Sequence, residues 1–156
     1  MAALSYPATE NGHAIISSIP GEEDSNNHTP GTTTVELPGY NAAPRGARWM
    51  LVRYAFAQKD YYKYDILGVT VVCSMTQTGG VDSYYISKVG SLRKAFDPTT
   101  VTYREYGAPN GYYDNISLGY GATSATATLS FAAGTAFDIL KNGLMLEPGH
   151  GLSMSI

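Results

Sequence analysis

Apolar and polar residues alternate in short runs over the last two-thirds of the chain, from residue 48 to residue 156. A period of two residues is typical of a β-strand with one buried face. The clearest run is 123–131, where one face collects Ala125, Ala127, Leu129 and Phe131. The run 66–75 is the most apolar, and its β-branched residues predict a strand covered on both faces. Other predicted strands are 48–57, 83–89, 99–104, 135–140 and 151–156.

Residues 1–44 show a different pattern. They contain no long apolar segment and are interrupted by prolines at positions 7, 20, 30, 38 and 44. Proline lacks a backbone donor, so this spacing predicts neither a regular sheet ladder nor an amphipathic helix. We therefore expect residues 1–44 to form an extended N-terminal arm, with two short extended pieces at 14–19 and 32–37. Residues 45–156 are then the folded domain.

About eight short strands, separated by Gly and Pro turns and with no convincing helix, are typical of an antiparallel sandwich or small barrel. We predict an all-β fold, an antiparallel β-sandwich of the jelly-roll type. An immunoglobulin-type sandwich is the second choice, because Cys73 is the only cysteine and the paired cysteines of that fold are missing.

Composition narrows the functional classes. Only 15% of the residues are charged, the net charge is -3, and the ten Lys and Arg residues are scattered. This pattern disfavours nucleic-acid binding. Cys73 lies in an apolar run and is expected to be a small buried side chain. No run reaches the ~18 apolar residues of a membrane span, and the first residues lack a secretion signal, so we expect synthesis in a cytoplasm.

The chemistry-bearing residues do not form a recognisable catalytic set. His13 and His28 fall in the predicted arm, and His150 falls in a glycine turn. Metalloprotease, nucleophile-turn and phosphate-loop motifs are absent from the sequence. We therefore expect no enzyme activity, no metal and no cofactor.

Tyrosine is in clear excess, with 13 residues against four Phe and one Trp. Tyrosine packs in cores and also suits interfaces, where it offers a large rigid area with a polar tip. Core packing, subunit or capsid contact, and glycan contact all remain open for these residues. Trp49 is interpreted as an anchor in the core or in a subunit contact, in preference to a platform on which a ligand stacks. The predicted partner-binding residues are Ile15, Ile16, Val35, Leu37, Tyr40, Trp49, Tyr61, Tyr62, Tyr112 and Tyr113.

The combination of a proline-broken arm, a cysteine-poor β domain and a closing segment 143–156 with a Pro-Gly-His turn resembles the decoration (cement) proteins of tailed bacteriophages. The stretch 51–74, an apolar strand, a loop and a Gly-Val-Thr-Val-Val strand, is similar as well. The resemblance implies a homotrimer that stands on the capsid surface of the virion and binds the major capsid protein. It also implies that the arm clasps neighbouring subunits, with segment 32–37 able to add a strand to a neighbour's sheet.

A second interpretation comes from the tyrosine-rich loops 60–65 and 105–114. Tyrosine rings beside Asp and Asn offer stacking surfaces and hydrogen-bond acceptors for a sugar. The segments 51–74 and 143–156 also resemble parts of phage tail-fibre tips, so a domain that binds a host glycan receptor is the alternative function.

Overall fold

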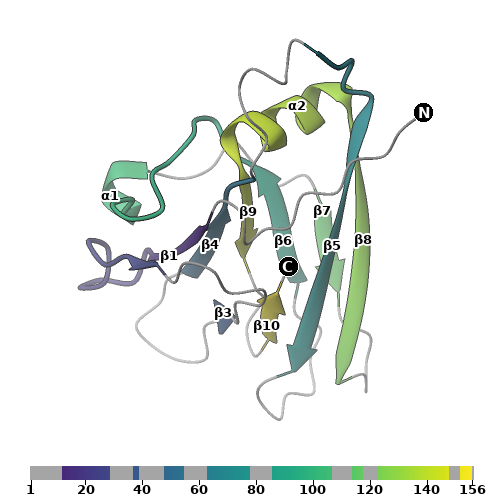
Figure 1. The fold of residues 1–156 in the computed structure, drawn as a ribbon. Helices are drawn as coiled ribbons and strands as arrows, with labels where there is room; N and C mark the ends of the chain where they lie inside the picture. Colours follow the sequence, from purple (N-terminus) through teal and green to yellow (C-terminus); the bar gives the residue numbers. More distant parts are fainter. Residues whose placement is uncertain are drawn as a thin grey trace.

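The computed structural model describes residues 12–28, 37–38, 48–54, 63–77, 86–106, 114–117, 123–147 and 152–155. These residues form two antiparallel β-sheets (Figure 1). The six-stranded sheet has the order β2-β1-β4-β9-β6-β7, and the four-stranded sheet has the order β3-β10-β5-β8. The prediction of an all-β fold with antiparallel sheets is confirmed at this level.

The six-stranded sheet is built from segments that are far apart in the sequence. Its strands are β1 (His13–Ser17), β2 (Asn27–His28), β4 (Arg48–Val52), β6 (Ile86–Ser91), β7 (Asp114–Ser117) and β9 (Leu144–Glu147). The four-stranded sheet contains β3 (Leu37–Pro38), β5 (Gly68–Gln77), β8 (Ser124–Ala132) and β10 (Leu152–Ser155). The described residues hold ten strands, two of which are only two residues long; seven of the ten lie within residues 48–156, where about eight were predicted.

Strand β4 lies at the centre of the core because both of its faces are buried. Met50 and Val52 belong to one apolar cluster, which also contains Val71, Cys73 and Met75 of β5 and residues of β6, β8, β9 and α2. This cluster lies between the two sheets. Trp49 and Leu51 face the other way, into a second cluster with Leu92, Phe96 and Val101. The segment between β6 and α1 (Tyr103–Tyr106) thus covers the outer face of the six-stranded sheet over β1, β4 and β9.

Strand β1 differs from the expected arm. It pairs with β4 over five residues, from His13↔Val52 to Ser17↔Arg48, and β2 covers its other edge. Ala14 and Ile16 are fully buried. Residues His13–Ser17 are therefore part of the folded domain and not of an arm. A short strand needs no long apolar run of its own when a neighbouring strand provides its backbone hydrogen bonds.

Strand β5 was predicted to be covered on both faces, and this is wrong. Its side chains alternate, with Val71, Cys73 and Met75 buried and the intervening residues exposed. Val72 is 53% exposed. Strand β8 behaves as its pattern predicted, since its odd-numbered residues face the other sheet and its even-numbered residues face solvent.

The segment 135–140 is helical instead of extended. Helix α2 covers Ala133–Asn142 and buries Ala136 and Ile139, which are one turn apart. A strand there would have placed Asp138 on the same face as Ala136. In the helix, residues three apart lie on one face, so Ala136 and Ile139 both face the core. The helix ends at Gly143, whose φ of 111° disfavours other residues. A β-carbon at Gly143 would also lie 2.5 Å from the Val52 carbonyl oxygen.

The segment 99–104 was predicted as a strand and is instead a turn followed by α1. The Glu105 N–H donates to Thr102 Oγ1 at 3.4 Å, so Thr102 caps the helix. The N–H groups of Tyr103 and Arg104 donate to the Glu23 carbonyl oxygen. The turn between β1 and β2 therefore satisfies donors that the short helix leaves open.

We expect Ile16→Ala to lower the free energy of unfolding by about 2–5 kcal/mol, the usual cost of a cavity at a fully buried aliphatic side chain. Leu67→Ala is the matched control, because Leu67 is 64% exposed and should change stability by less than about 0.5 kcal/mol. Urea unfolding of the full chain measures both variants. Equal effects of the two variants would contradict a core position for β1.

Candidate functional site

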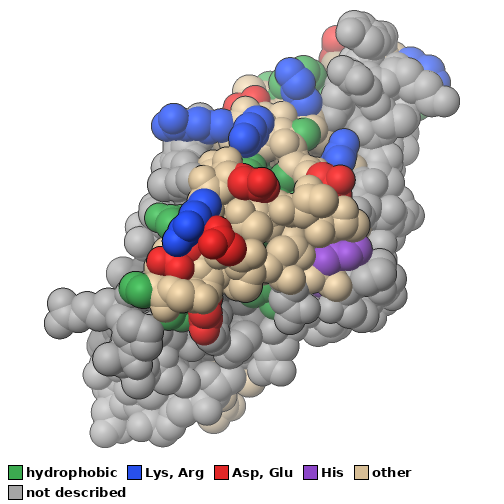
Figure 2. Space-filling view, turned by 90° about the vertical axis from the view of Figure 1, so that its left-hand side faces the viewer, with side chains coloured by type: hydrophobic (Ala, Val, Ile, Leu, Met, Phe, Trp, Pro, Cys, Tyr) green, Lys and Arg blue, Asp and Glu red, His purple; other side chains and the backbone are tan. Residues whose placement is uncertain are grey.

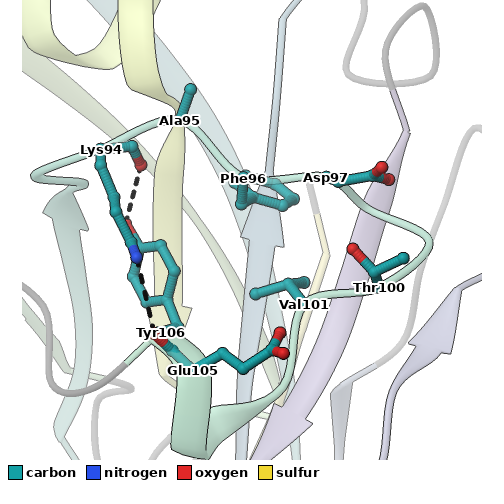
Figure 3. A pocket seen from close by; sticks show the side chains of 8 residues that line it. All are labelled: Lys94, Ala95, Phe96, Asp97, Thr100, Val101, Glu105 and Tyr106. Carbon is teal, nitrogen blue, oxygen red and sulfur yellow. Dashed lines mark hydrogen bonds between the residues drawn. The ribbon is translucent and has the colours of Figure 1, made fainter.

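A cleft of about 160 Å³ opens beside α1, on the outer side of the six-stranded sheet (Figure 3). It is lined by residues from the segment after β6 and from α1 itself: Lys94, Ala95, Phe96, Asp97, Thr100, Val101, Glu105 and Tyr106. Phe96 and Val101 also belong to the buried cluster beneath, so the floor of the cleft is continuous with the core. The cleft is therefore positioned by the packing of the sheet.

One wall of the cleft is held together by Lys94 and Tyr106. The Tyr106 hydroxyl donates to the Lys94 carbonyl oxygen at 3.0 Å, and the Lys94 Nζ donates to the Glu105 carbonyl oxygen at 3.5 Å. The Lys94 ammonium also lies 5.7 Å from the centre of the Tyr106 ring, and the Lys94 side chain lies beside that ring in Figure 3. Burial raises the pKa of Tyr106 to about 12, so its hydroxyl stays a neutral donor at physiological pH.

The opposite wall carries a carboxylate that stays ionised. The side chain and backbone N–H of Thr99 both donate to Asp97 Oδ1, at 2.6 and 2.8 Å. These two bonds, with smaller contributions from the charges of Arg53 and His28, lower the pKa of Asp97 below its usual value. The cleft thus presents a fixed negative charge at its rim.

Asn26 ties the cleft to the turn after β1. Its Nδ2 donates to the carbonyl oxygens of Pro98 and Val101, at 3.1 and 2.6 Å. On the same face, Arg104 forms an exposed ion pair with Asp24 at 3.3 Å. Figure 2 shows that the described basic and acidic side chains are intermixed on this face and form no patch of a single sign. This surface therefore offers both positively and negatively charged groups to a binding partner.

The residues that line the cleft include no Ser, Cys or His. The cleft offers one ammonium group, two carboxylates, two hydroxyls and two aromatic rings, which are groups that can bind a polar ligand. Among the residues that the structure describes, no three His, Cys, Asp or Glu side chains are placed to hold a metal ion. Neither described helix has the length and apolar content to cross a membrane.

The predicted partner-binding residues are distributed differently from the cleft. Ile16 is fully buried in the core, and Ile15 packs partly buried on the other cluster. Trp49 is also buried: its Nε1 donates to Glu147 Oε2 at 2.8 Å, and its ring lies 5.0 Å from that of Tyr103. Ile16 and Trp49 are thus core residues within the chain.

Of the remaining predicted partner-binding residues, one is in an edge strand and the others lie outside the described residues. Leu37 belongs to β3, at the edge of the four-stranded sheet. Outside the described residues lie Val35, Tyr40, Tyr61, Tyr62, Tyr112 and Tyr113. Sequence reasoning missed Asp97 and Lys94 as site residues. The one available signal was the Asp-Pro-Thr-Thr turn at 97–100, where Asp followed two residues later by Thr is a common local hydrogen-bonding motif.

A second group of polar residues lies near the cleft. His13 is only 3% exposed, and its Nε2 has no hydrogen-bond partner among the described residues. Its ring centre lies 6.4 Å from that of His28. Burial, and to a smaller extent the charge of His28, lowers the pKa of His13. Protonation of His13 therefore opposes folding.

The chain was compared with known proteins. No protein-family model matches it. No curated protein matches it significantly.

The lowered pKa of His13 predicts a pH-dependent stability. The unfolded chain takes up a proton near the ordinary value of 6.5 and the folded chain at a lower pH, so stability is complete above 6.5 and falls as the pH drops below it. We expect His13→Leu to flatten this fall and His28→Leu to retain most of it, since burial is the larger cause. Urea midpoints at pH 7.5 and pH 5 (about one unit above and about one and a half units below the ordinary value) check both variants. An unchanged fall in His13→Leu would contradict this assignment.

Proposed function

We propose that the chain is a structural virion protein, a trimeric decoration (cement) protein with a jelly-roll domain. In this proposal it binds the outer surface of a phage capsid through the major capsid protein and stabilises the shell. The resemblance of segments 51–74 and 143–156 to such proteins supports the proposal. So does the architecture of two packed antiparallel sheets, which is compatible with such a domain.

The observation that carries the proposal is the attachment of β3. Among the described residues, this two-residue strand forms one edge of the four-stranded sheet and pairs with β10 at Ser153↔Pro38 and Met154↔Leu37. A strand held by two residue pairs is weakly fixed to its own chain. The same edge can accept the equivalent segment of a neighbour, and exchange of identical segments is a low-cost way to join protomers. Segment 37–38 is therefore proposed to clasp the adjacent subunit.

Strand β3 offers a precise test, because Pro38 has no backbone N–H and Leu37 supplies the only backbone donor in the strand. Leu37→Pro removes that donor, whereas deletion of residues 1–44 would also remove β1 and its core contacts. We expect light scattering to show that the wild-type chain associates in threes, with a mass that is three times the 16.7 kDa chain mass or a multiple of that value. We expect Leu37→Pro to weaken association by about tenfold, the equivalent of about 1.4 kcal/mol, with a near-normal urea midpoint.

The capsid itself supplies the second measurement. Empty expanded capsids of the phage whose genome encodes the chain should retain the wild-type protein on sedimentation and release Leu37→Pro. Leu67→Ala is the control and should sediment like wild type. A chain that is monomeric at every concentration and does not sediment with capsids would overturn the proposal.

The cleft supports a second function, the binding of a host glycan. Glu105 and Tyr106 come from the loop 105–114 that the sequence singled out, and they line the cleft with Asp97 and Lys94. An ionised carboxylate accepts hydrogen bonds from sugar hydroxyls, and an ammonium group donates them. These groups converge on one opening of the surface.

A glycan array probed with the full chain tests this second function. We expect Asp97→Asn to lower the affinity for a glycan that binds the wild-type chain by about tenfold, since a hydrogen bond to a charged group contributes about 1.5–3 kcal/mol. Leu67→Ala should bind like wild type. An array without binding at high protein concentration would contradict a glycan role for the cleft.

A further inference from the structure

Within the part of the chain that the structure describes, the four sheet edges differ sharply in length. In the order of the two sheets, the edge strands are β2 and β7 on one and β3 and β8 on the other. Strands β2 and β3 have two residues each and β7 has four, whereas β8 has nine. Short edges offer little to a passing strand, which is one way proteins avoid unwanted pairing. Strand β8 is the exception among the described edges.

Strand β8 also lacks the other protections of an edge. Its sequence, Ser-Ala-Thr-Ala-Thr-Leu-Ser-Phe-Ala, contains no charge and no proline. It pairs with β5 through nine consecutive residue pairs, so no bulge twists it away. Figure 1 shows no described element on its outer side. Ala125, Ala127 and Leu129 face the other sheet and yet remain only half-buried, which leaves the side of the sandwich open.

The backbone register shows which groups point outward. The Gln77 N–H donates to the Thr123 carbonyl oxygen at 2.9 Å, one step beyond the pair Thr76↔Ser124. Bonded and non-bonded pairs alternate along an antiparallel ladder, so the odd-numbered residues of β8 bond to β5. The N–H and C=O groups directed to the open edge are those of Ser124, Thr126, Thr128, Ser130 and Ala132.

These outward groups are self-complementary about Thr128, the middle residue of the strand. An antiparallel copy centred there places residues together in pairs whose numbers sum to 256, and every outward group meets an outward group. On the inner face, Ala125 then lies opposite Phe131, and Ala127 lies opposite Leu129, so a small side chain meets a large one. On the outer face, Thr128 meets Thr128, and Thr126 meets Ser130. Such hydroxyl pairs are favourable across strands, and no like charges meet.

We propose that β8 binds β8 of a second copy of this chain, antiparallel about a two-fold axis at Thr128, so that the two four-stranded sheets become one. The contact is isologous and closes on itself, because each copy has one such edge. It covers the half-buried inner residues of both strands. It joins copies in pairs and does not depend on the proposed capsid role or on exchange of β3.

Crosslinking at the axis tests the geometry. Directly opposed residues in a bonded antiparallel pair have Cα atoms about 5.5 Å apart, which a disulfide spans. We expect Thr128→Cys to form a disulfide-linked dimer under mild oxidation. Thr70→Cys is the matched control: it is equally exposed on β5, but two strands separate it from its symmetry mate. The wild-type chain controls for Cys73, which is buried and has a pKa raised to about 11 by burial.

A charge at the axis tests the energetics. Thr128→Lys places two like charges against each other across the two-fold axis. Val72→Lys is the matched control, because Val72 is the cross-strand partner of Thr128 on the same exposed face, one strand inward. We expect light scattering to show that Thr128→Lys loses paired association by at least about tenfold and that Val72→Lys keeps it. Urea midpoints confirm that both variants are folded.

The outcomes separate this inference from the capsid proposal. Dimer formation by Thr128→Cys with loss of pairing in Thr128→Lys supports the β8 contact, whatever the result with capsids. Equal crosslinking of Thr128→Cys and Thr70→Cys, or none in either, overturns it. So does a Thr128→Lys variant with the same mass as wild type. A trimer that binds capsids and fails these tests would leave the proposed function standing alone.

Discussion

The fold depends on the burial of β4 on both of its faces. A strand in that position must have both neighbours present, because every unpaired backbone group in a dry interior costs free energy. The neighbours are β9 from near the C-terminal end and β1 from near the N-terminal end. The packing of β4 therefore draws the two ends of the chain into one sheet. The segment 92–106 is then needed to cover Trp49 and Leu51, and that cover creates the cleft.

Strands with one buried face were the best predicted from the sequence. Strand β8 has a strict period of two, and its inner face is the one that its pattern indicates. Strand β5 was located correctly, but its exposure was not, because an apolar residue such as Val72 was taken as evidence of a second cover. Strand β1 was missed as part of the domain, since its burial arises from pairing with residues more than 30 positions away. Helix α2 was missed because a three-residue spacing in a short segment resembles alternation.

The candidate site was less predictable than the fold, for a physical reason. Asp97 acquires its fixed charge from a local turn with Thr99, and this much is encoded in neighbouring residues. The cleft around Asp97 requires Asn26 to hold the turn from 72 positions away, and it requires α1 to be capped by the Glu23 carbonyl oxygen. The tyrosine content indicated an interface, and Trp49 was also named as a partner-binding residue. The structure shows that Trp49 is buried and donates a hydrogen bond to Glu147 within the chain. Composition alone does not distinguish these two uses of an aromatic ring.

The two sheets solve the problem of exposed backbone in different ways. The six-stranded sheet is covered on both faces at β1, β4 and β9, and its described edge strands have only two and four residues. The four-stranded sheet leaves the outer face of β5 and β8 to solvent and ends in a nine-residue strand without charge, proline or bulge. An edge of that kind is a liability for a chain that must stay solitary. Its small-to-large inner pattern gives the edge a partner of matching shape, a second copy of itself, and this converts the liability into a defined contact.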